Sequence, residues 1–260
     1  MTQPKALIFD VDGTLADTER DGHRIAFNRA FAAAGLDWDW DAALYGRLLS
    51  VTGGKERMHH YLSDYVYRGR PVPADLAARI PALHAAKNRY YAELMQEGAV
   101  ALRPGVERLL REARAAGIRL AIATTTTGEN IAALLISTLG PESMDWFEVM
   151  ASADEVPDKK PSPAVYLYAM DLLGLEAADC IAFEDSENGL IAARRAGLRT
   201  IVTVNDYTRE GAFDDATLVV DHLGEPDLPF TVLGGRAGAR VPRSMRCVDS
   251  ALLEWLPADD

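Results

Sequence analysis

The chain has 260 residues, of which 48% are hydrophobic and 25% charged, and its formal net charge is -12. This length suits one large domain or a core with an inserted subdomain. The acidic balance argues against a nucleic-acid partner, because a phosphate backbone selects proteins with basic faces.

No apolar run approaches the ~20 residues that a membrane helix needs, so no membrane partner is expected either. Cys180 and Cys247 fit neither a metal-binding spacing nor a disulfide framework, which favours a reducing compartment. The first five residues lead into a strand without a leader-like segment. We therefore expect a cytoplasmic enzyme, and a monomer.

The first predicted strand is the apolar run at residues 6–9, and two aspartates follow it. Side chains alternate along a strand, so Asp10 and Asp12 leave the strand end on the same side. Two close carboxylates repel, which suggests that a cation holds one or that one carries a proton for chemistry. The alternative is an Asp-Gly turn, which accounts for Asp12 and Gly13 but gives no reason for Asp10.

Residues 19–98 have a helical pattern without a convincing strand. Within this block Phe27, Ala30, Phe31 and Ala34 form one apolar stripe, which ends at Gly35. Because the first strand precedes the block and the other strands follow it, the block is predicted to be an inserted α-helical cap. The predicted domains are a discontinuous core, residues 1–18 and 99–260, and a cap, residues 19–98.

Helices and strands alternate after the cap. The predicted helices are 105–116, 129–139, 163–173 and 186–196, and the predicted strands are 118–123, 147–150, 180–183 and 200–204. Strands separated by helices indicate a parallel sheet covered on both faces, an α/β core of the Rossmann-like kind. Beyond residue 221 the pattern predicts a glycine-rich loop and a short helix at 251–255, to which we assign no function.

Polar residues follow four of the predicted strands, where ligands bind in open parallel sheets. They are Asp10 and Asp12, then Thr124, Thr125 and Thr126, then Lys159 and Lys160, then Glu184 and Asp185. Taken singly, these groups are explained as well by helix caps and solvated turns. Taken together they supply carboxylates, a hydroxyl beside free helix amides and an ammonium, the groups of a magnesium-dependent phosphoryl-transfer site.

The order of these motifs resembles the haloacid dehalogenase superfamily of phosphohydrolases, in the group with an α-helical cap. The DxDGT segment, a strand ending in Thr, a Lys-Pro pair and a strand ending in Glu-Asp carry the resemblance. A closer similarity, to sugar-phosphate phosphatases of the CbbY type, rests on segments 16–28, 52–57, 123–127, 159–163 and 183–190. The tail after residue 221 lies outside these motifs.

The resemblance implies a role for each residue of the core site. Asp10 would be the nucleophile that forms an aspartyl-phosphate, and Asp12 would protonate the leaving oxygen and then activate water. The implied Mg²⁺ ligands are Asp10, Asp12 through its carbonyl, Asp185, and Glu184 at or behind the metal. The implied phosphoryl and substrate contacts are Thr124, Thr125, Thr126 and Lys160.

The cap carries a second candidate anion site, the segment TGGKER at residues 52–57. Two glycines let backbone amides approach an oxyanion, and two cations follow at a predicted helix start. By itself this motif is better explained by an exposed basic turn, but the resemblance reverses that preference and favours substrate binding and a second phosphate. It suggests xylulose 1,5-bisphosphate, a misfire product of Rubisco, as the substrate. The predicted cap contacts are Glu19, Arg20, His23, Gly53, Gly54, Lys55 and Arg57.

Other functions fit parts of the same pattern. A sugar phosphomutase of the β-phosphoglucomutase kind shares the core motifs and the cap, but must protect its aspartyl-phosphate from water. A non-enzymatic phosphoacceptor module also uses Asp, Thr and Lys on a parallel sheet, yet needs neither the acid at Asp12 nor a cap. A dehalogenase has no use for that acid.

Overall fold

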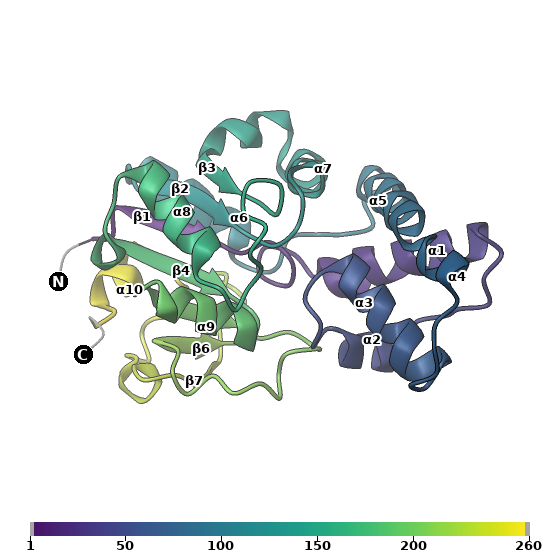
Figure 1. The fold of residues 1–260 in the computed structure, drawn as a ribbon. Coiled ribbons are helices and arrows are strands. Elements are labelled where there is room, and N and C mark those ends of the chain that lie inside the picture. Colours follow the sequence, from purple (N-terminus) through teal and green to yellow (C-terminus); the bar gives the residue numbers. More distant parts are fainter. Residues whose placement is uncertain (1–2, 258–260) are drawn as a thin grey trace. The chain divides into compact units, whose positions relative to one another are not determined.

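The computed structural model describes residues 3–257, and the chain divides into two units (Figure 1). The core unit is Met1–Asp17 with Ala101–Asp260, and the cap unit is Thr18–Val100. The boundaries expected from the sequence, 18/19 and 98/99, lie within two residues of these.

One sheet organises the core unit. Its strands are β1 (Ala6–Phe9), β2 (Arg119–Ala123), β3 (Phe147–Ala151), β4 (Cys180–Glu184), β5 (Arg199–Thr203), β6 (Leu218–Val220) and β7 (Val232–Gly234). Their order across the sheet is β3-β2-β1-β4-β5-β6-β7. All neighbouring pairs are parallel except β6 and β7. The first strand of the chain is therefore central, and all four of its residues are buried.

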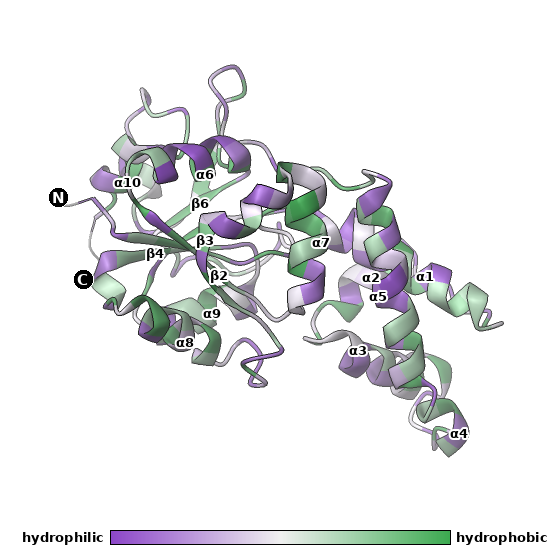
Figure 2. Cartoon of the chain, turned by 90° about the horizontal axis from the view of Figure 1, so that it is seen from above, coloured by the Kyte–Doolittle hydropathy of each residue, from purple (hydrophilic) through white to green (hydrophobic). Residues whose placement is uncertain are grey.

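Helices cover both faces of this sheet. They are α6 (Val106–Ala115), α7 (Gly128–Leu139), α8 (Ala164–Leu173), α9 (Glu187–Arg195) and α10 (Ser250–Trp255), with 3-10 turns at Pro141–Trp146, Ala177–Asp179 and Gly238–Arg240. Figure 2 shows α8 and α9 on one face and α6 and α10 on the other.

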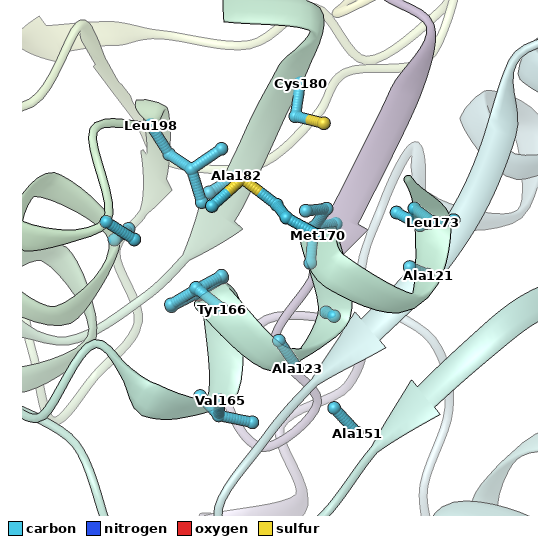
Figure 3. Close-up of a cluster of buried hydrophobic side chains, with 14 of the residues drawn as sticks. Ala121, Ala123, Ala151, Val165, Tyr166, Met170, Leu173, Cys180, Ala182 and Leu198 are labelled. Atoms are coloured by element: carbon cyan, nitrogen blue, oxygen red, sulfur yellow. The ribbon is translucent and has the colours of Figure 1, made fainter. Parts of the chain in front are cut away.

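Period-two alternation sorts the strand residues between these faces. Ile8 and Ala182 pack with α8 and α9 in one apolar cluster (Figure 3). Their neighbours Phe9 and Phe183 are paired in register, and their rings stack with centroids 4.4 Å apart. Both faces of the central strands are thus apolar, which confines polar chemistry to the strand ends.

The parallel α/β core is confirmed, with one correction. Strands β6 and β7 were not predicted, and the expectation of a loop around residue 234 is wrong because β7 adds an antiparallel edge strand there. Each of these strands has three residues, too few to show an alternating pattern, and β7 is only half-buried and ends in glycine.

The cap unit is helical. Its elements are a π-helical turn (Glu19–His23), α1 (Arg24–Ala33), α2 (Ala42–Leu48), α3 (Gly54–His60), a second π-helical turn (Tyr61–Val66), α4 (Ala74–Ala77) and α5 (Ile80–Gln96). Buried aromatic rings, among them Phe27, Phe31, Trp40 and Tyr45, form its core. Within residues 3–257, no helix has the length and apolar character needed to cross a bilayer.

Candidate active site

The polar residues after β1, β2 and β4 meet at one edge of the core sheet. Asp10 follows β1, and its backbone N–H donates to the carbonyl of Phe183 in β4 (2.9 Å). Parallel pairing in register brings Asp10 level with Glu184 at the end of β4 and with the last residue of β2, directly before Thr124. All three side chains are buried. The sheet therefore collects this part of the predicted core site.

Lys160 lies at the centre of this group. Its ammonium donates to Asp10 Oδ1 (2.7 Å), to Glu184 Oε1 (2.6 Å) and to the carbonyl of Ala123 (2.9 Å). An ammonium has three protons, and these three acceptors use all of them. The same oxygen of Glu184 also accepts a short hydrogen bond from the hydroxyl of Tyr166. Glu184 is completely buried, so the structure gives its carboxylate a partner role toward Lys160.

Asp185 is held by a residue that the sequence analysis missed. The side-chain amide of Asn205, two residues beyond β5, donates to Asp185 Oδ2 (2.7 Å). The other end of that amide, Oδ1, accepts from the backbone N–H of Tyr207 (2.9 Å), so Asn205 is fixed at both ends. Asn205 could have been predicted from the sequence, because it follows a parallel strand as the other four polar groups do.

Burial makes the carboxylate cluster electrostatically costly. It raises the pKa of Asp10 to about 7, with Lys160 opposing the rise and Glu184 and Asp12 adding to it. The pKa of Asp185 is raised well above its ordinary value by burial and by the charges of Asp10 and Glu184. The single positive charge of Lys160 does not balance the negative charge of these carboxylates, so we expect a further cation at the site.

The oxygen atoms present fit Mg²⁺. Asp10, Glu184 and Asp185 each offer a carboxylate oxygen, and these atoms all lie within 4.8 Å of one another. A Cβ at Gly13 would lie 2.2 Å from Asp185 Oδ2, so the backbone after Asp12 passes close to this carboxylate. Hard oxygen donors in a small cluster are what Mg²⁺ prefers.

The threonines beyond β2 are ordered by local hydrogen bonds. The hydroxyl of Thr124 accepts from the backbone N–H of Thr126 (3.3 Å), and the hydroxyl of Thr126 accepts from the amide of Asn130 (3.0 Å). Thr127, one residue later, is the N-cap of α7. The helix cap that could have explained the threonine run is thus supplied by Thr127, while Thr125 is half-buried.

In the cap unit, Arg57 is buried and already has protein partners. Its guanidinium donates to the hydroxyl of Tyr45 (2.8 Å) and lies 3.6 Å from Glu19 Oε2. The Tyr45 hydroxyl in turn donates to the same Glu19 oxygen (2.5 Å). Two of the residues predicted to contact substrate, Glu19 and Arg57, therefore form one network with a tyrosine that the sequence did not single out.

The start of α3 lies beside His84 of α5. Gly53 has φ +98, a value that favours glycine, and a Cβ at Gly54 would lie 2.7 Å from Nε2 of His84. Lys55 is exposed, whereas Lys87 is buried, with its ammonium 5.1 Å from the centroid of the Tyr91 ring. Burial, together with the charges of Lys87 and Lys55, lowers the pKa of His84 to about 4. The sequence analysis missed His84 and Lys87, because a helical pattern does not show which polar side chains of a helix pack against its neighbours.

The remaining two predicted cap contacts are placed differently from each other. Arg20 pairs with Asp21 through two hydrogen bonds of 2.8 Å. His23 is buried, and its ring stacks on Tyr91 with centroids 4.3 Å apart. His23 therefore belongs to the packed interior of the cap unit, beside the ring that Lys87 covers.

Residues 4–197 match the family model of haloacid dehalogenase-like hydrolases. The chain belongs to this hydrolase family. It is 52% identical over 229 residues to the plasmid protein CbbY of Cupriavidus necator, covering 87% of this chain and 88% of the relative.

Two crystal structures of CbbY from Rhodobacter sphaeroides have the same fold, each with a TM-score of 0.78 and 45% identity. One contains phosphate and covers 92% of this chain and 100% of its own. The other is an Asp-to-Asn variant in complex with xylulose-(1,5)bisphosphate, covering 90% of this chain and 98% of its own. We call Asp10, Lys160, Glu184 and Asp185 the carboxylate-lysine site. Because the chain has this site and is similar to these relatives, the hydrolase is a phosphatase.

Proposed function

We propose that this phosphatase hydrolyses a small sugar phosphate through an aspartyl-phosphate on Asp10, and that xylulose 1,5-bisphosphate is its substrate. The observation that carries the proposal is the contact of Lys160 with Asp10, beside Asp185 and Thr124, at the strand ends. The crystal structure of the related CbbY with that bisphosphate supports the choice of substrate.

In the first step an oxygen of Asp10 attacks the phosphorus, and the bond from phosphorus to the sugar oxygen breaks. Lys160 reduces the repulsion between the carboxylate and the phosphoryl oxygens. Asp12 donates a proton to the leaving sugar oxygen, so the sugar leaves as an alcohol. Thr124 and the backbone beyond β2 hold the phosphoryl oxygens.

In the second step Asp12 takes a proton from water, and the water oxygen attacks the phosphorus. The bond between the phosphorus and Asp10 breaks, which regenerates the carboxylate and releases inorganic phosphate. Asp10, Asp185 and the carbonyl of Asp12 would hold Mg²⁺, which supplies positive charge to the phosphoryl oxygens. Glu184, whose accepting oxygen is used by Lys160 and Tyr166, serves chiefly to hold the lysine.

The cap is proposed to bind the phosphate that is not transferred. Lys55, exposed beside Gly53 and Gly54, supplies the cation, and the charge of the nearby Lys87 adds to the local potential. Arg57 has a different role in this proposal: with Tyr45 it fixes one oxygen of Glu19, leaving the other oxygen to accept from a sugar hydroxyl. Lys55 should thus affect the second phosphate, and Arg57 the sugar.

The test compares phosphate release from a pentulose bisphosphate, a pentulose monophosphate and glucose 1-phosphate, with Mg²⁺ and with a chelator. Lys55→Ala should raise KM for the bisphosphate by about tenfold or more, equivalent to one lost charge-assisted contact, and change the monophosphates little. Lys5→Ala, a second exposed lysine, is the matched control. An equal effect of Lys55→Ala on all substrates would refute the second-phosphate site.

Two aspartate variants test the mechanism. Asp10→Asn should abolish phosphate release, and Asp12→Asn should slow it strongly and allow phosphoprotein to accumulate. Full activity of Asp10→Asn would remove the proposed nucleophile. Isomerisation of glucose 1-phosphate faster than its hydrolysis would identify a mutase instead, and a stable phosphoprotein in the wild type would identify a phosphoacceptor.

A further inference from the structure

Tyr166 is a polar side chain in an apolar part of the core unit. It lies on α8, it is completely buried, and it belongs to the cluster between this helix and the sheet. Figure 3 shows it among alanines of the strands, including Ala123 and Ala182. A phenylalanine would satisfy the packing equally well, so the hydroxyl needs a reason beyond the core.

The hydroxyl of Tyr166 is connected to the nucleophile through two other side chains. It donates to Glu184 Oε1, the oxygen that also accepts from Lys160 (2.6 Å), and Lys160 donates to Asp10 Oδ1 (2.7 Å). Every member of this series is at least nine-tenths buried. Hydrogen bonds in such a low-dielectric setting polarise one another.

The position of Lys160 depends on two carboxylates that compete for its ammonium. Glu184 Oε1 accepts from it at 2.6 Å and Asp10 Oδ1 at 2.7 Å, so the two carboxylates share one ammonium. The proton that Tyr166 gives to Glu184 Oε1 satisfies part of the charge of that carboxylate, which weakens its hold on Lys160. Without the hydrogen bond from Tyr166, Glu184 would bind the ammonium of Lys160 more tightly. Less of the positive charge of Lys160 would then act on the phosphoryl group.

We propose that Tyr166 is a positioning residue for phosphoryl transfer, which acts through Glu184 to set how far Lys160 is available to Asp10 and the transferring phosphoryl oxygens. The inference rests on the proposed function for the reaction itself, but concerns a residue whose hydroxyl donates to Glu184 and not to Asp10. It predicts an effect on the chemical step, because Lys160 acts where charge builds up during transfer.

The experiment compares Tyr166→Phe with Tyr168→Phe. Tyr168 is half-buried on the same helix and is not among the described hydrogen-bond partners of Glu184 or Lys160. With p-nitrophenyl phosphate and with the sugar bisphosphate, Tyr166→Phe should lower kcat about tenfold, the usual effect of one hydrogen bond to a charged group, and change KM less than twofold. Tyr168→Phe should match the wild type. Equal kinetics of the two variants would overturn the proposal.

A second readout does not depend on turnover. In protein labelled with ¹⁵N at the lysine side chains, the Lys160 signal is assigned by its loss in Lys160→Met. It should shift in Tyr166→Phe and stay in place in Tyr168→Phe. An unmoved signal in Tyr166→Phe would refute the connection through Glu184.

The two readouts separate this inference from the proposed function. Hydrolysis of p-nitrophenyl phosphate without hydrolysis of the bisphosphate would defeat the proposed substrate, while the kcat comparison on the first compound would still decide the role of Tyr166. If neither compound were hydrolysed, the proposed function would fail, and the lysine signal would decide whether Tyr166 positions Lys160.

Discussion

Gly189 makes room for the buried carboxylate of Glu184. It lies inside α9, where alanine is ordinarily better than glycine by about 1 kcal/mol. A Cβ at this position would lie 1.9 Å from Glu184 Oε2, so the substitution forces the carboxylate or the helix to move. The packing conflict outweighs the helix preference and reverses the sign of the effect.

Gly189→Ala should therefore lower the free energy of unfolding by about 1–3 kcal/mol, the usual cost of overpacking, and should reduce kcat because Glu184 holds Lys160. The measurements are denaturant unfolding and phosphate release. Gly128→Ala is the control, since its Cβ would have ordinary contacts of 3.5 Å at the start of α7. Similar results for the two variants would contradict the prediction.

The residues of the site differ in how visible they are in the sequence. Asp10, Lys160 and Asp185 could be predicted because a polar residue after an apolar strand has a definite place in a parallel sheet. Tyr166 could not, since the apolar stripe of a helix accepts tyrosine and phenylalanine alike. Arg57 was identified as a substrate-binding cation, but a motif does not show that Tyr45 and Glu19 surround it.

Arg103 joins three connections of the core unit. Its buried guanidinium donates to the carbonyls of Gly13 after β1, of Val204 after β5 (2.5 Å) and of Asp221 after β6 (2.7 Å). These carbonyls lie beyond the strand ends and, within residues 3–257, accept no hydrogen bond from a neighbouring strand. The guanidinium of Arg103 supplies donors to all three.

Arg103→Met should cost about 3 kcal/mol or more of unfolding free energy, because several charge-assisted hydrogen bonds are lost and buried carbonyls are left without donors. Arg119→Met removes an exposed ion pair with Glu148 and should cost less than about 1 kcal/mol. Equilibrium unfolding of both variants checks the difference, and equal losses would show that the guanidinium does not hold these loops together.

His84 couples the stability of the cap helices to pH. Its pKa is lowered from 6.5 to about 4 by burial and by Lys87, Lys55 and His23, while Glu56 opposes the change. Because the unfolded chain binds this proton more readily, the contribution of His84 to stability is full above pH ~6.5 and is lost as pH falls toward ~4.

His84→Gln should make unfolding less sensitive to pH than in the wild type between pH 7.5 and 5. His59→Gln, an exposed histidine of α3, is the control. The quantity measured is the change in unfolding midpoint between the two pH values. Other groups contribute equally to each variant and cancel in the comparison. The same pH sensitivity in both variants would refute the assignment.

Most helices and strands could be predicted because their apolar residues form a clear pattern, whereas strands with a weak pattern could not. Strands β1, β2 and β4 each contain four consecutive apolar residues. Glycines such as Gly117, Gly174 and Gly197 marked helix ends, each with positive φ. Strands β6 and β7 have three residues each, too few for a clear pattern; β6 is buried between β5 and β7, and β7 is a half-buried edge strand. Their pairing depends on tertiary contacts rather than on local pattern.

At the level of the whole chain, the cap enters and leaves the core at one place. Ala16 and Leu102 form an antiparallel bridge, and the N–H of Arg103 donates to the carbonyl of Leu15 (2.9 Å). All seven strands and the residues of the carboxylate-lysine site belong to the core unit. A core without its cap therefore retains the complete sheet. Only a short linker is needed to join its two segments, because Ala16 and Leu102 are neighbours.

Replacing residues 18–100 with a short glycine-serine linker should give a folded protein that hydrolyses p-nitrophenyl phosphate but has lost its preference for the bisphosphate. Circular dichroism checks the fold, and phosphate release from both compounds checks the activity. The same deletion with Asp10→Asn is the blank. Retained preference for the bisphosphate would place substrate selection in the core.

The central place of β1 has a consequence for synthesis of the chain on the ribosome. Its four buried residues pair with β2 and β4, and β2 begins at Arg119, so about 110 residues separate β1 from its nearest partner. At roughly 5–20 residues per second, this apolar strand emerges many seconds before any strand can pair with it. During that interval the cap unit emerges in full while β1 has no partner strand, so β1 is an exposed apolar segment of the kind that chaperones bind.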